Sequence, residues 1–332
     1  MTPTWTRLPD LASRAVGGSV VWANDDLFAE RENLITKAEP EYRPHTFGHR
    51  GQIYDGWETR RRREPGDDSA IIRLGLPGVI RGVVVDTAFF KGNYPPSATV
   101  EATRAAGYPA PEELAGWEVV VPRAPLEGDR KHYFDVHAER RYTHVRLTIH
   151  PDGGVARLRV FGDPVADPDL LLPNAVDLAA MENGASVIGC SDMFFGAPGN
   201  LIAPGHATSM GEGWETARRR DDGNDWVEVA LAAPGVVALA ELDTSHFKGN
   251  APGWASVRGR DVRKDPDDWF DLLPRTRLQP DTRHRFRVSG PEATHARLDI
   301  HPDGGMARLR LFGRLTPAGL DELTRRFTEL TS

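Results

Sequence analysis

A 13-residue sequence occurs twice in this chain. Residues 150–162 read HPDGGVARLRVFG and residues 301–313 read HPDGGMARLRLFG, so 11 of the 13 positions are identical. Two other strings recur: DTAFFKGN at 86–93 as DTSHFKGN at 243–250, and GWET at 56–59 as GWET at 213–216. His301 lies 151 residues after His150, whereas solenoid repeats recur every 20–50 residues or so, roughly a third of that distance or less. The sequence therefore predicts two whole domains in tandem.

The predicted domains divide the chain almost evenly. The first repeat is expected over residues 10–163 and the second over 177–314, with a linker rich in Pro and Asp at 164–176. Because the chain has 332 residues, each repeat is long enough to bury a core of its own.

Within each repeat, apolar residues alternate with polar ones, which is typical of half-buried strands. Val145, Leu147 and Ile149 alternate in this way, Asp152-Gly153-Gly154 supplies a tight turn, and 157–160 alternates again. These residues are expected to form a hairpin, repeated at 295–311. Short strands interrupted by 33 Gly and 26 Pro residues predict an all-β fold of two antiparallel β-sandwiches.

The C-terminus is the exception to this β pattern. Thr316 and Pro317 form a helix-start signal, and the apolar residues that follow fall on one face. A short helix is therefore expected over 315–332.

Composition excludes several classes of partner. The net charge of −7 argues against nucleic acid and anionic membranes, which require a basic surface. The sequence contains no stretch of signal-peptide or membrane-spanning character, and Cys190 is its single cysteine. We therefore expect a cytoplasmic protein without a disulfide framework.

The turn string carries His150 and Asp152, for which two interpretations are open. Asp152 is either a turn cap or a functional carboxylate, and His150 is either packed at a sheet corner or a general acid or base near neutral pH. A divalent metal site at His-x-Asp is possible but not favoured, since no third ligand has a telling spacing. We therefore predict no metal and no cofactor.

The string at 86–93 follows an apolar strand, and polar residues in this place are typical of a binding loop mounted on a rigid sheet. Lys91 could pair with a substrate carboxylate, and Asp86 could accept protons or activate water. The alternative is an internal Asp86–Lys91 salt bridge that holds the loop, with Asn93 simply making the turn.

The third string combines Glu58 with arginines at 60–63. Arginine can clamp a planar anion through two parallel hydrogen bonds. If the segment is a strand, Arg61 lies on the face opposite Glu58. Arg60 is the weakest candidate, because its counterpart is Ala217.

These repeated strings resemble those of the allantoicase family, over a range from about Asp10 to Gly313. The resemblance implies two repeats, each a jelly-roll β-sandwich similar to galactose-binding domains. It also implies a hydrolase of linear amidine C–N bonds that converts allantoate and water into (S)-ureidoglycolate and urea in purine breakdown.

Roles can be assigned on this reading. We expect Arg61 and Lys91 to hold the carboxylate of allantoate, Glu58 and Asp86 to bind ureido groups or water, and His150 with Asp152 to transfer protons. The predicted catalytic residues are Asp86, His150, Asp152, Asp243, His301 and Asp303. The predicted substrate-binding residues are Glu58, Arg61, Lys91, Asn93, Glu215, Arg218, Lys248 and Asn250. The sequence leaves open whether one repeat or both form a site.

Two other classes of function compete with the enzyme. The first is a non-catalytic, carbohydrate-type binding protein, since β-sandwiches often serve as binding modules. The second is an interaction scaffold whose repeated polar residues form internal salt bridges. The enzyme is favoured because the repeated residues are charged rather than exposed aromatics, and we expect it to form a homo-oligomer.

Overall fold

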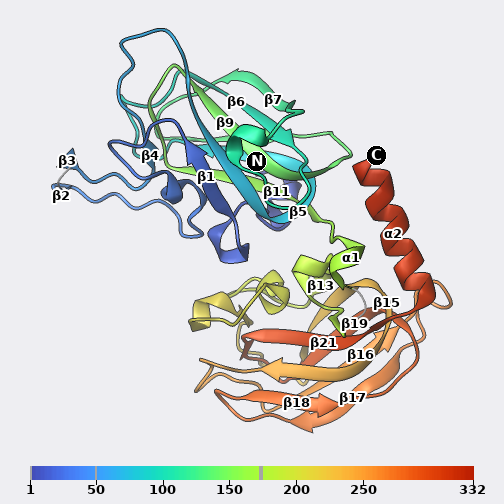
Figure 1. Cartoon of the computed structure of the whole chain (residues 1–332). Coiled ribbons are helices and arrows are strands. Elements are labelled where there is room, and N and C mark those ends of the chain that lie inside the picture. The colour runs from blue at the N-terminus through green and yellow to red at the C-terminus, as the bar shows by residue number, and fades with distance from the viewer. Residues whose placement is uncertain (1, 49–50, 172–174) are drawn as a thin grey trace. The chain divides into compact units, whose positions relative to one another are not determined.

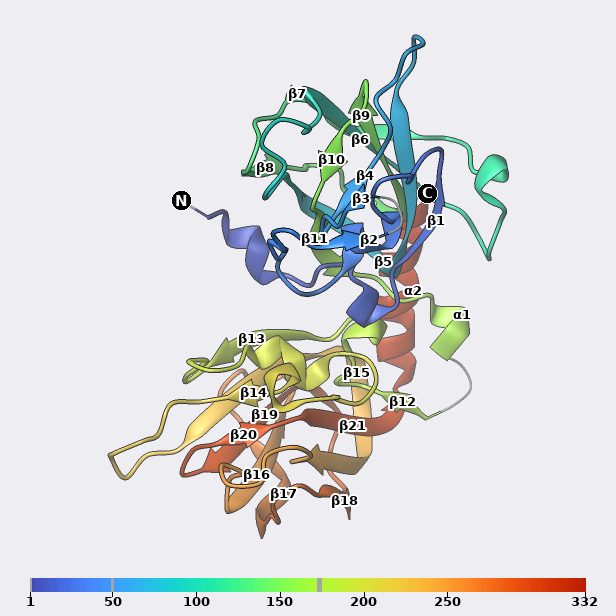
Figure 2. The ribbon, with the colours of Figure 1, turned by 90° about the vertical axis from the view of Figure 1, so that its left-hand side faces the viewer.

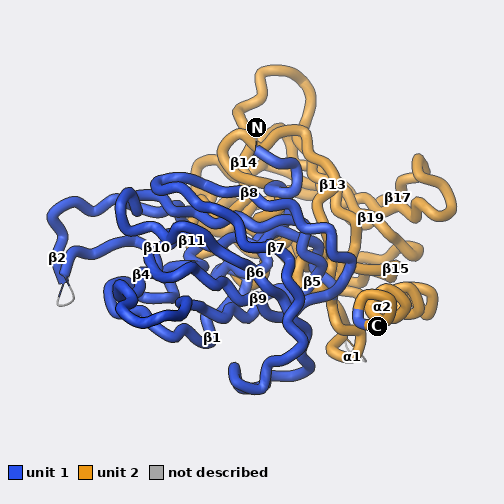
Figure 3. Tube along the Cα trace, turned by 90° about the horizontal axis from the view of Figure 1, so that it is seen from above, with its two compact units in different colours: residues 1–165, 331 blue, residues 166–330, 332 orange. Residues whose placement is uncertain are grey.

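The computed structural model describes residues 2–48, 51–171 and 175–332 and contains two compact units. One unit ends at Val165 and the other begins at Ala166 (Figure 3). Each is a β-sandwich (Figure 1), and the strand pairings of the first recur in the second, which has one further edge strand. The expected linker begins at Pro164, the last residue of a strand, and contains a short helix at Pro168–Leu171; its residues 172–174 lie outside the described part.

The first unit contains eleven strands in the residues that the structure describes. They are β1 Ser19–Ala23, β2 Phe47–Gly48, β3 Gly51–Gln52, β4 Trp57–Glu58, β5 Asp68–Asp86, β6 Ser97–Thr103, β7 Glu118–Pro125, β8 Lys131–Asp135, β9 Arg141–His150, β10 Gly154–Val155 and β11 Arg157–Pro164. Short 3-10 helices connect them at Thr4–Arg7, Arg14–Val16, Arg31–Ile35 and Pro111–Glu113.

The second unit repeats this series, with an added strand, β12, and with no counterpart of β2 and β3 among its described residues. Its strands are β12 Val176–Asp177, β13 Ser186–Cys190, β14 Trp214–Glu215, β15 Asp225–Asp243, β16 Trp254–Arg260, β17 Phe270–Arg277, β18 Arg283–Arg287, β19 Ala293–His301, β20 Gly305–Met306 and β21 Arg308–Leu315. Its helices are α1 Pro168–Leu171, α2 Pro317–Thr331 and the 3-10 turns Met181–Asn183, Pro198–Ile202 and Met210–Glu212.

The long strand β5 belongs to both layers of the first sandwich. Its first half pairs with β1 and β9, and its second half, from Gly78 onward, pairs with β8 and β11. The register shifts between Arg73 and Gly78, where Pro77 lacks a backbone donor. Strands that bend in this way carry the chain from one sheet of a sandwich to the other. In the second unit β15 does the same around Pro234, so both units are jelly rolls.

The core of each sandwich is built from alternating residues, as predicted. Val145, Leu147 and Ile149 of β9 are fully buried, as are Leu298 and Ile300 of β19. Period-two burial of this kind places one face of each strand on the core.

The hairpin expected at 144–160 was wrong. β9 and β11 are both strands, but they do not pair with each other; each pairs with a different half of β5. The turn between them crosses from one layer to the other, and β10 within it pairs with β4. Alternation predicts a strand but carries no information about its partner.

The predicted C-terminal helix is present as α2. The Thr316 hydroxyl accepts a hydrogen bond from the Gly319 N–H at 3.1 Å, which caps the helix as its start signal predicts. Leu323 on its apolar face is buried. Within the described residues, no helix is long and apolar enough to cross a membrane.

Candidate functional site

The three repeated strings meet at one junction in the first unit. Strand β4 pairs with β10 (Figure 2), and in this pairing Glu58 lies opposite Gly154 of the turn string. Asn93 contacts both: its backbone oxygen accepts from the Gly154 N–H at 2.7 Å, and its Nδ2 donates to Glu58 Oε1 at 2.6 Å. Two of the predicted binding residues, Glu58 and Asn93, are therefore in direct contact.

Phe90 explains why the turn string carries two glycines. A Cβ on Gly154 would lie 2.0 Å from Phe90 Cδ1, so no larger residue fits beneath this buried ring. Gly153 has a φ of 141°, a conformation that favours glycine. The ring and the turn together fix Asn93, three residues after Phe90, against Glu58.

Glu58 is a buried carboxyl with one oxygen unused. It is 8% exposed, and its Oε2 is buried without a hydrogen-bond partner among the described residues. Burial raises the pKa of Glu58, and the hydrogen bond from Asn93 opposes this shift. Because burial favours the neutral form, this carboxyl can hold a proton and release it to a nearby group.

Tyr54 lies at the same junction and was not predicted. Its ring centroid is 5.6 Å from that of Phe90. Burial raises the pKa of the Tyr54 hydroxyl, and the charge of Glu58 raises it further. The hydroxyl is 3.5 Å from Gln52 Oε1, a weak contact. No sequence signal marked Tyr54, because it lies outside the repeated strings.

The second unit repeats the junction. Glu215 lies opposite Gly305, the Asn250 backbone oxygen accepts from the Gly305 N–H at 2.8 Å, and Asn250 Nδ2 donates to Glu215 Oε1 at 2.5 Å. Asn250 Nδ2 is also 3.4 Å from the sulfur of Met210. The pairing of a glutamate with an asparagine is thus common to both repeats, but their surroundings differ.

The arginine run is not a strand, because β4 ends at Glu58, so the alternation of faces considered for a strand does not apply. Arg60 pairs with Asp25 at 2.6 Å, and Arg62 pairs with the buried Asp68 at 2.5 Å. Arg61 is exposed and has no ion pair among the described residues, and the same holds for Arg218 of the second unit. Alternate side chains of the run are therefore structural, and Arg61 is left available to a ligand.

Asp152 and Asp303 are tied to this run. Asp152 Oδ2 accepts a hydrogen bond from the Arg62 N–H at 2.8 Å, and Asp303 Oδ2 accepts one from the Arg219 N–H at the same distance. Each carboxylate thus has one oxygen engaged by the backbone of the arginine run, and not by its own turn as the turn-cap interpretation requires.

Asp86 and Lys91 do not form the internal salt bridge considered as an alternative. Asp86 is buried, its Oδ1 accepts from the Ala88 N–H at 2.9 Å, and burial raises its pKa. The Lys91 side chain is 76% exposed and lies 3.7 Å from Asp129 instead. In the second unit, Asp243 caps Ser245 and Lys248 lies 4.0 Å from Asp281.

His150 is held from both sides. It is 9% exposed, its Nε2 is 2.9 Å from the Thr99 hydroxyl, and its Nδ1 is 2.9 Å from Asp67 Oδ2. His301 is half-buried, and burial lowers its pKa, with Arg275 adding to the shift. Asp67 was not predicted, and its counterpart 157 positions later is Asn224.

Two repeated arginines have a structural role that the sequence did not show. Arg157 is buried and donates to the carbonyls of Ala38 and Asp55, as well as pairing with the Asp55 carboxylate at 2.9 Å. Arg308 likewise donates to Gly205 and Glu212. These arginines anchor the segment before GWET, which in the first unit carries Tyr54.

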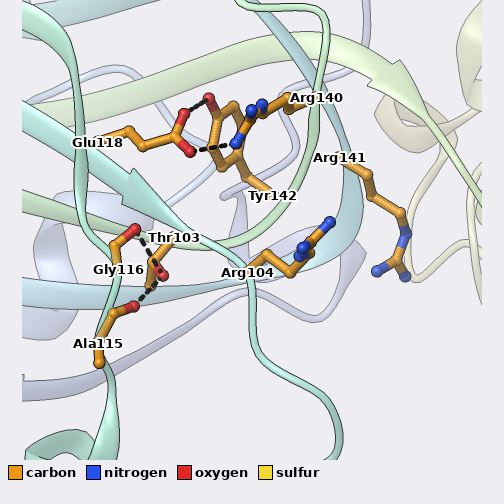
Figure 4. A pocket seen from close by; sticks show the side chains of 8 residues that line it. All are labelled: Thr103, Arg104, Ala115, Gly116, Glu118, Arg140, Arg141 and Tyr142. Atoms are coloured by element: carbon orange, nitrogen blue, oxygen red, sulfur yellow. Dashed lines mark hydrogen bonds and ion pairs between the residues drawn. The ribbon is translucent and has the colours of Figure 1, made fainter. Parts of the chain in front are cut away.

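The described residues contain no group of three metal-binding side chains. A cavity of about 250 Å³ lies elsewhere in the first unit (Figure 4), where Glu118 engages Arg140 at 2.6 Å and the Tyr142 hydroxyl at 2.9 Å. None of the predicted site residues lines it.

Fold and site together define a protein of two tandem jelly rolls, each with a hydrogen-bonded Glu–Asn pair at the junction of three repeated motifs. The family model, the relatives and the solved structures reported below all name allantoicase. The family model "Allantoicase repeat" matches residues 9–165 and 176–316. The chain therefore belongs to the allantoicase family.

Relatives cover nearly the whole chain. A probable allantoicase from Nocardia farcinica is 57% identical, over 94% of this chain and 95% of the relative. One from Streptomyces coelicolor is 50% identical, over 98% and 90%. The crystal structure of allantoicase from Saccharomyces cerevisiae matches with a TM-score of 0.78 and 34% identity, covering 92% of this chain and 93% of that one.

Proposed function

We propose that this chain is an allantoicase, a hydrolase that converts allantoate and water into (S)-ureidoglycolate and urea. The observation that carries the proposal is the buried Glu58–Asn93 pair, formed where the repeated motifs of the family meet. Burial raises the pKa of the Glu58 carboxyl, a property that acid–base chemistry uses, and its place at the meeting point of the repeated motifs favours the enzyme over a carbohydrate-type binding module.

The reaction sets clear chemical requirements. Allantoate is a carboxylate with two ureido groups on one carbon, so its binding requires a cation and its ureido groups require hydrogen-bonding partners. Arg61 and Lys91 are exposed cations near the repeated motifs, and we assign them to the carboxylate. Asn93 and Glu58 are assigned to the ureido groups. Asp86 is assigned to holding the binding loop, where its Oδ1 accepts a hydrogen bond from the Ala88 N–H.

Proton transfer can be assigned to Glu58. In its protonated form the carboxyl gives its proton to the ureido nitrogen as the bond from that nitrogen to the central carbon breaks, which releases urea. The remaining ureido nitrogen stabilises the electron-poor carbon. Water then bonds to this carbon and returns one proton to Glu58, so the carboxyl ends as it began.

His150 with Asp152 remains the second candidate for proton transfer. Both ring nitrogens of His150 lie 2.9 Å from protein partners, and Asp152 accepts from backbone. A His150→Ala variant that folds and loses at least about a hundredfold in kcat would favour the histidine over Glu58.

We also propose the cofactor requirement, the partners, the location and the oligomeric state of the protein. The reaction needs no resident metal or cofactor on this assignment, because carboxyl and cationic side chains supply the chemistry. Allantoate is the small-molecule partner, and neither nucleic acid nor membrane is expected. The cytoplasmic location and the homo-oligomer remain predictions from the sequence.

The direct test is to incubate purified protein with allantoate and quantify both products. One urea and one ureidoglycolate for each allantoate consumed would support the proposal. Saturable sugar binding by folded protein that leaves allantoate unchanged would favour the binding module instead.

A further inference from the structure

We propose that the catalytic site is the Glu58–Asn93 pair of the first repeat, covered by Tyr54, and that the Glu215–Asn250 pair of the second repeat does not catalyse. This inference rests on the proposed function and names the repeat that performs it. It also adds a residue, Tyr54, as a group that contacts the substrate. Three independent differences between the repeats carry the argument.

The first difference is the use of the asparagine amide. Asn93 Nδ2 donates to Glu58, and the structure shows no other acceptor for it among the described residues, so one N–H remains for a ligand. Asn250 Nδ2 donates to Glu215 and also contacts the Met210 sulfur at 3.4 Å. In the second repeat the thioether therefore occupies the place that a ureido oxygen would take.

The second difference is the length of the segment that precedes the GWET string. Twenty-one residues separate Ile35 from Trp57, whereas eleven separate Ile202 from Trp214, so the first repeat has ten extra residues. This longer segment carries Tyr54, which lies near Phe90 and interacts electrostatically with Glu58. A phenol hydroxyl can donate to a ureido or carboxylate oxygen, whereas the sulfur of Met210 can only accept weakly.

The longer segment also supplies an aromatic wall. The Tyr42 ring lies 5.6 Å from that of Phe89, the residue at the positive-φ position of the DTAFFKGN string. The equivalent residue of the second repeat is His246, whose Nε2 is 3.0 Å from the Ala207 backbone oxygen. A pair of aromatic rings in the first repeat thus stands where the second repeat has a histidine bound to its own backbone.

The third difference is the burial of the two glutamate carboxyls and the partners of their oxygens. Glu58 is buried and its Oε2 has no partner among the described residues, whereas Glu215 is half-buried. The His150–Asp67 pair, at 2.9 Å, is also confined to the first repeat, because Asn224 stands at the position equivalent to Asp67. An unpaired buried carboxyl oxygen is costly unless a ligand or proton satisfies it.

Matched variants test the assignment. Glu58→Gln keeps an oxygen for Asn93 but cannot transfer a proton, so we expect kcat for allantoate to fall at least about a hundredfold. Glu215→Gln makes the same change in the second repeat and should leave kcat within about threefold. Tyr54→Phe should lower kcat/KM about tenfold, while Met210→Leu should not. Unchanged thermal midpoints would show that each variant is folded.

Binding stoichiometry gives a second measurement. Titration of Glu58→Gln with allantoate in a calorimeter should show one site per chain. Two equal sites, or equal losses in the two glutamine variants, would overturn the assignment while the proposed function stands.

If wild-type protein forms no urea from allantoate, the proposed function fails and this assignment with it. If Glu58→Gln does not fold, a Tyr54→Phe variant with normal kinetics overturns the role of Tyr54.

Discussion

Residues that look alike in the repeated strings differ in what they do. Within the arginine run, Arg60 and Arg62 are paired with Asp25 and Asp68, while Arg61 is exposed without an ion pair in the described part of the chain. Arg63 is also exposed and also has no ion pair among the described residues. Arg63 is therefore a matched control for the proposed binding of the substrate carboxylate by Arg61.

We expect Arg61→Ala to raise KM for allantoate at least about tenfold, because a charge-assisted contact to the carboxylate contributes more than about 1.5 kcal/mol. Arg63→Ala removes an equal charge two residues away and should change KM less than about twofold. Steady-state kinetics on both variants make the comparison. Equal effects would mean that only general charge attracts the substrate.

Asp177 provides a prediction about stability and pH. Burial raises its pKa to about 6, and hydrogen bonds from the Leu311 and Ala179 N–H groups oppose this shift. The folded state therefore holds a proton that the unfolded state has lost between about pH 4 and pH 6. The contribution of this group to stability is greatest below pH 4 and declines as the pH rises through 6.

Asp177→Asn should remove this dependence. Between pH 5 and pH 7 the variant should gain about 1 kcal/mol relative to wild type, the fraction of the shift that titrates in this range. Chemical denaturation of both proteins at the two pH values measures the difference. Parallel changes in the two proteins would mean that Asp177 is ionised throughout.

At the scale of elements, short strands and their turns hold the site. The β4–β10 pair positions Glu58, and the contact between Phe90 and Gly154 fixes the turn beneath it. The same arrangement recurs in the second unit, where a Cβ on Gly305 would lie 2.0 Å from Phe247 Cε1. The junction therefore depends on close packing as well as on hydrogen bonds.

Gly154→Ala should destabilise the protein by about 1–3 kcal/mol, since the added methyl group overlaps the Phe90 ring. Activity should fall with it, because the turn would shift away from Asn93. Gly92→Ala is the matched control from the neighbouring string, where an added Cβ meets nothing within 4 Å. If urea denaturation finds the two variants equally stable, close packing at this turn is not important.

At the scale of the whole molecule, the chain consists of two copies of one sandwich, and the described residues contain no group of three metal-binding side chains. We therefore expect allantoate hydrolysis to survive prolonged treatment with a chelator. The rate should stay within about twofold of the untreated rate, because charged side chains carry the proposed chemistry. A loss of activity that added divalent ions restore would contradict this prediction.

The sequence by itself determined the two domains, the strands, the C-terminal helix and the three motifs, because repetition, alternation and capping follow from the order of residues alone. It also selected Glu58 and Asn93, but as separate candidates. Only the tertiary structure decided that they meet, that β9 and β11 pair with different halves of β5, and that Tyr54 joins the junction. Arg62 and Asp68 lie 2.5 Å apart across a loop, and His150 at the end of β9 meets Asp67 in the loop before β5. Such pairings depend on how distant segments pack, and no local pattern records the partner that a charged side chain will find.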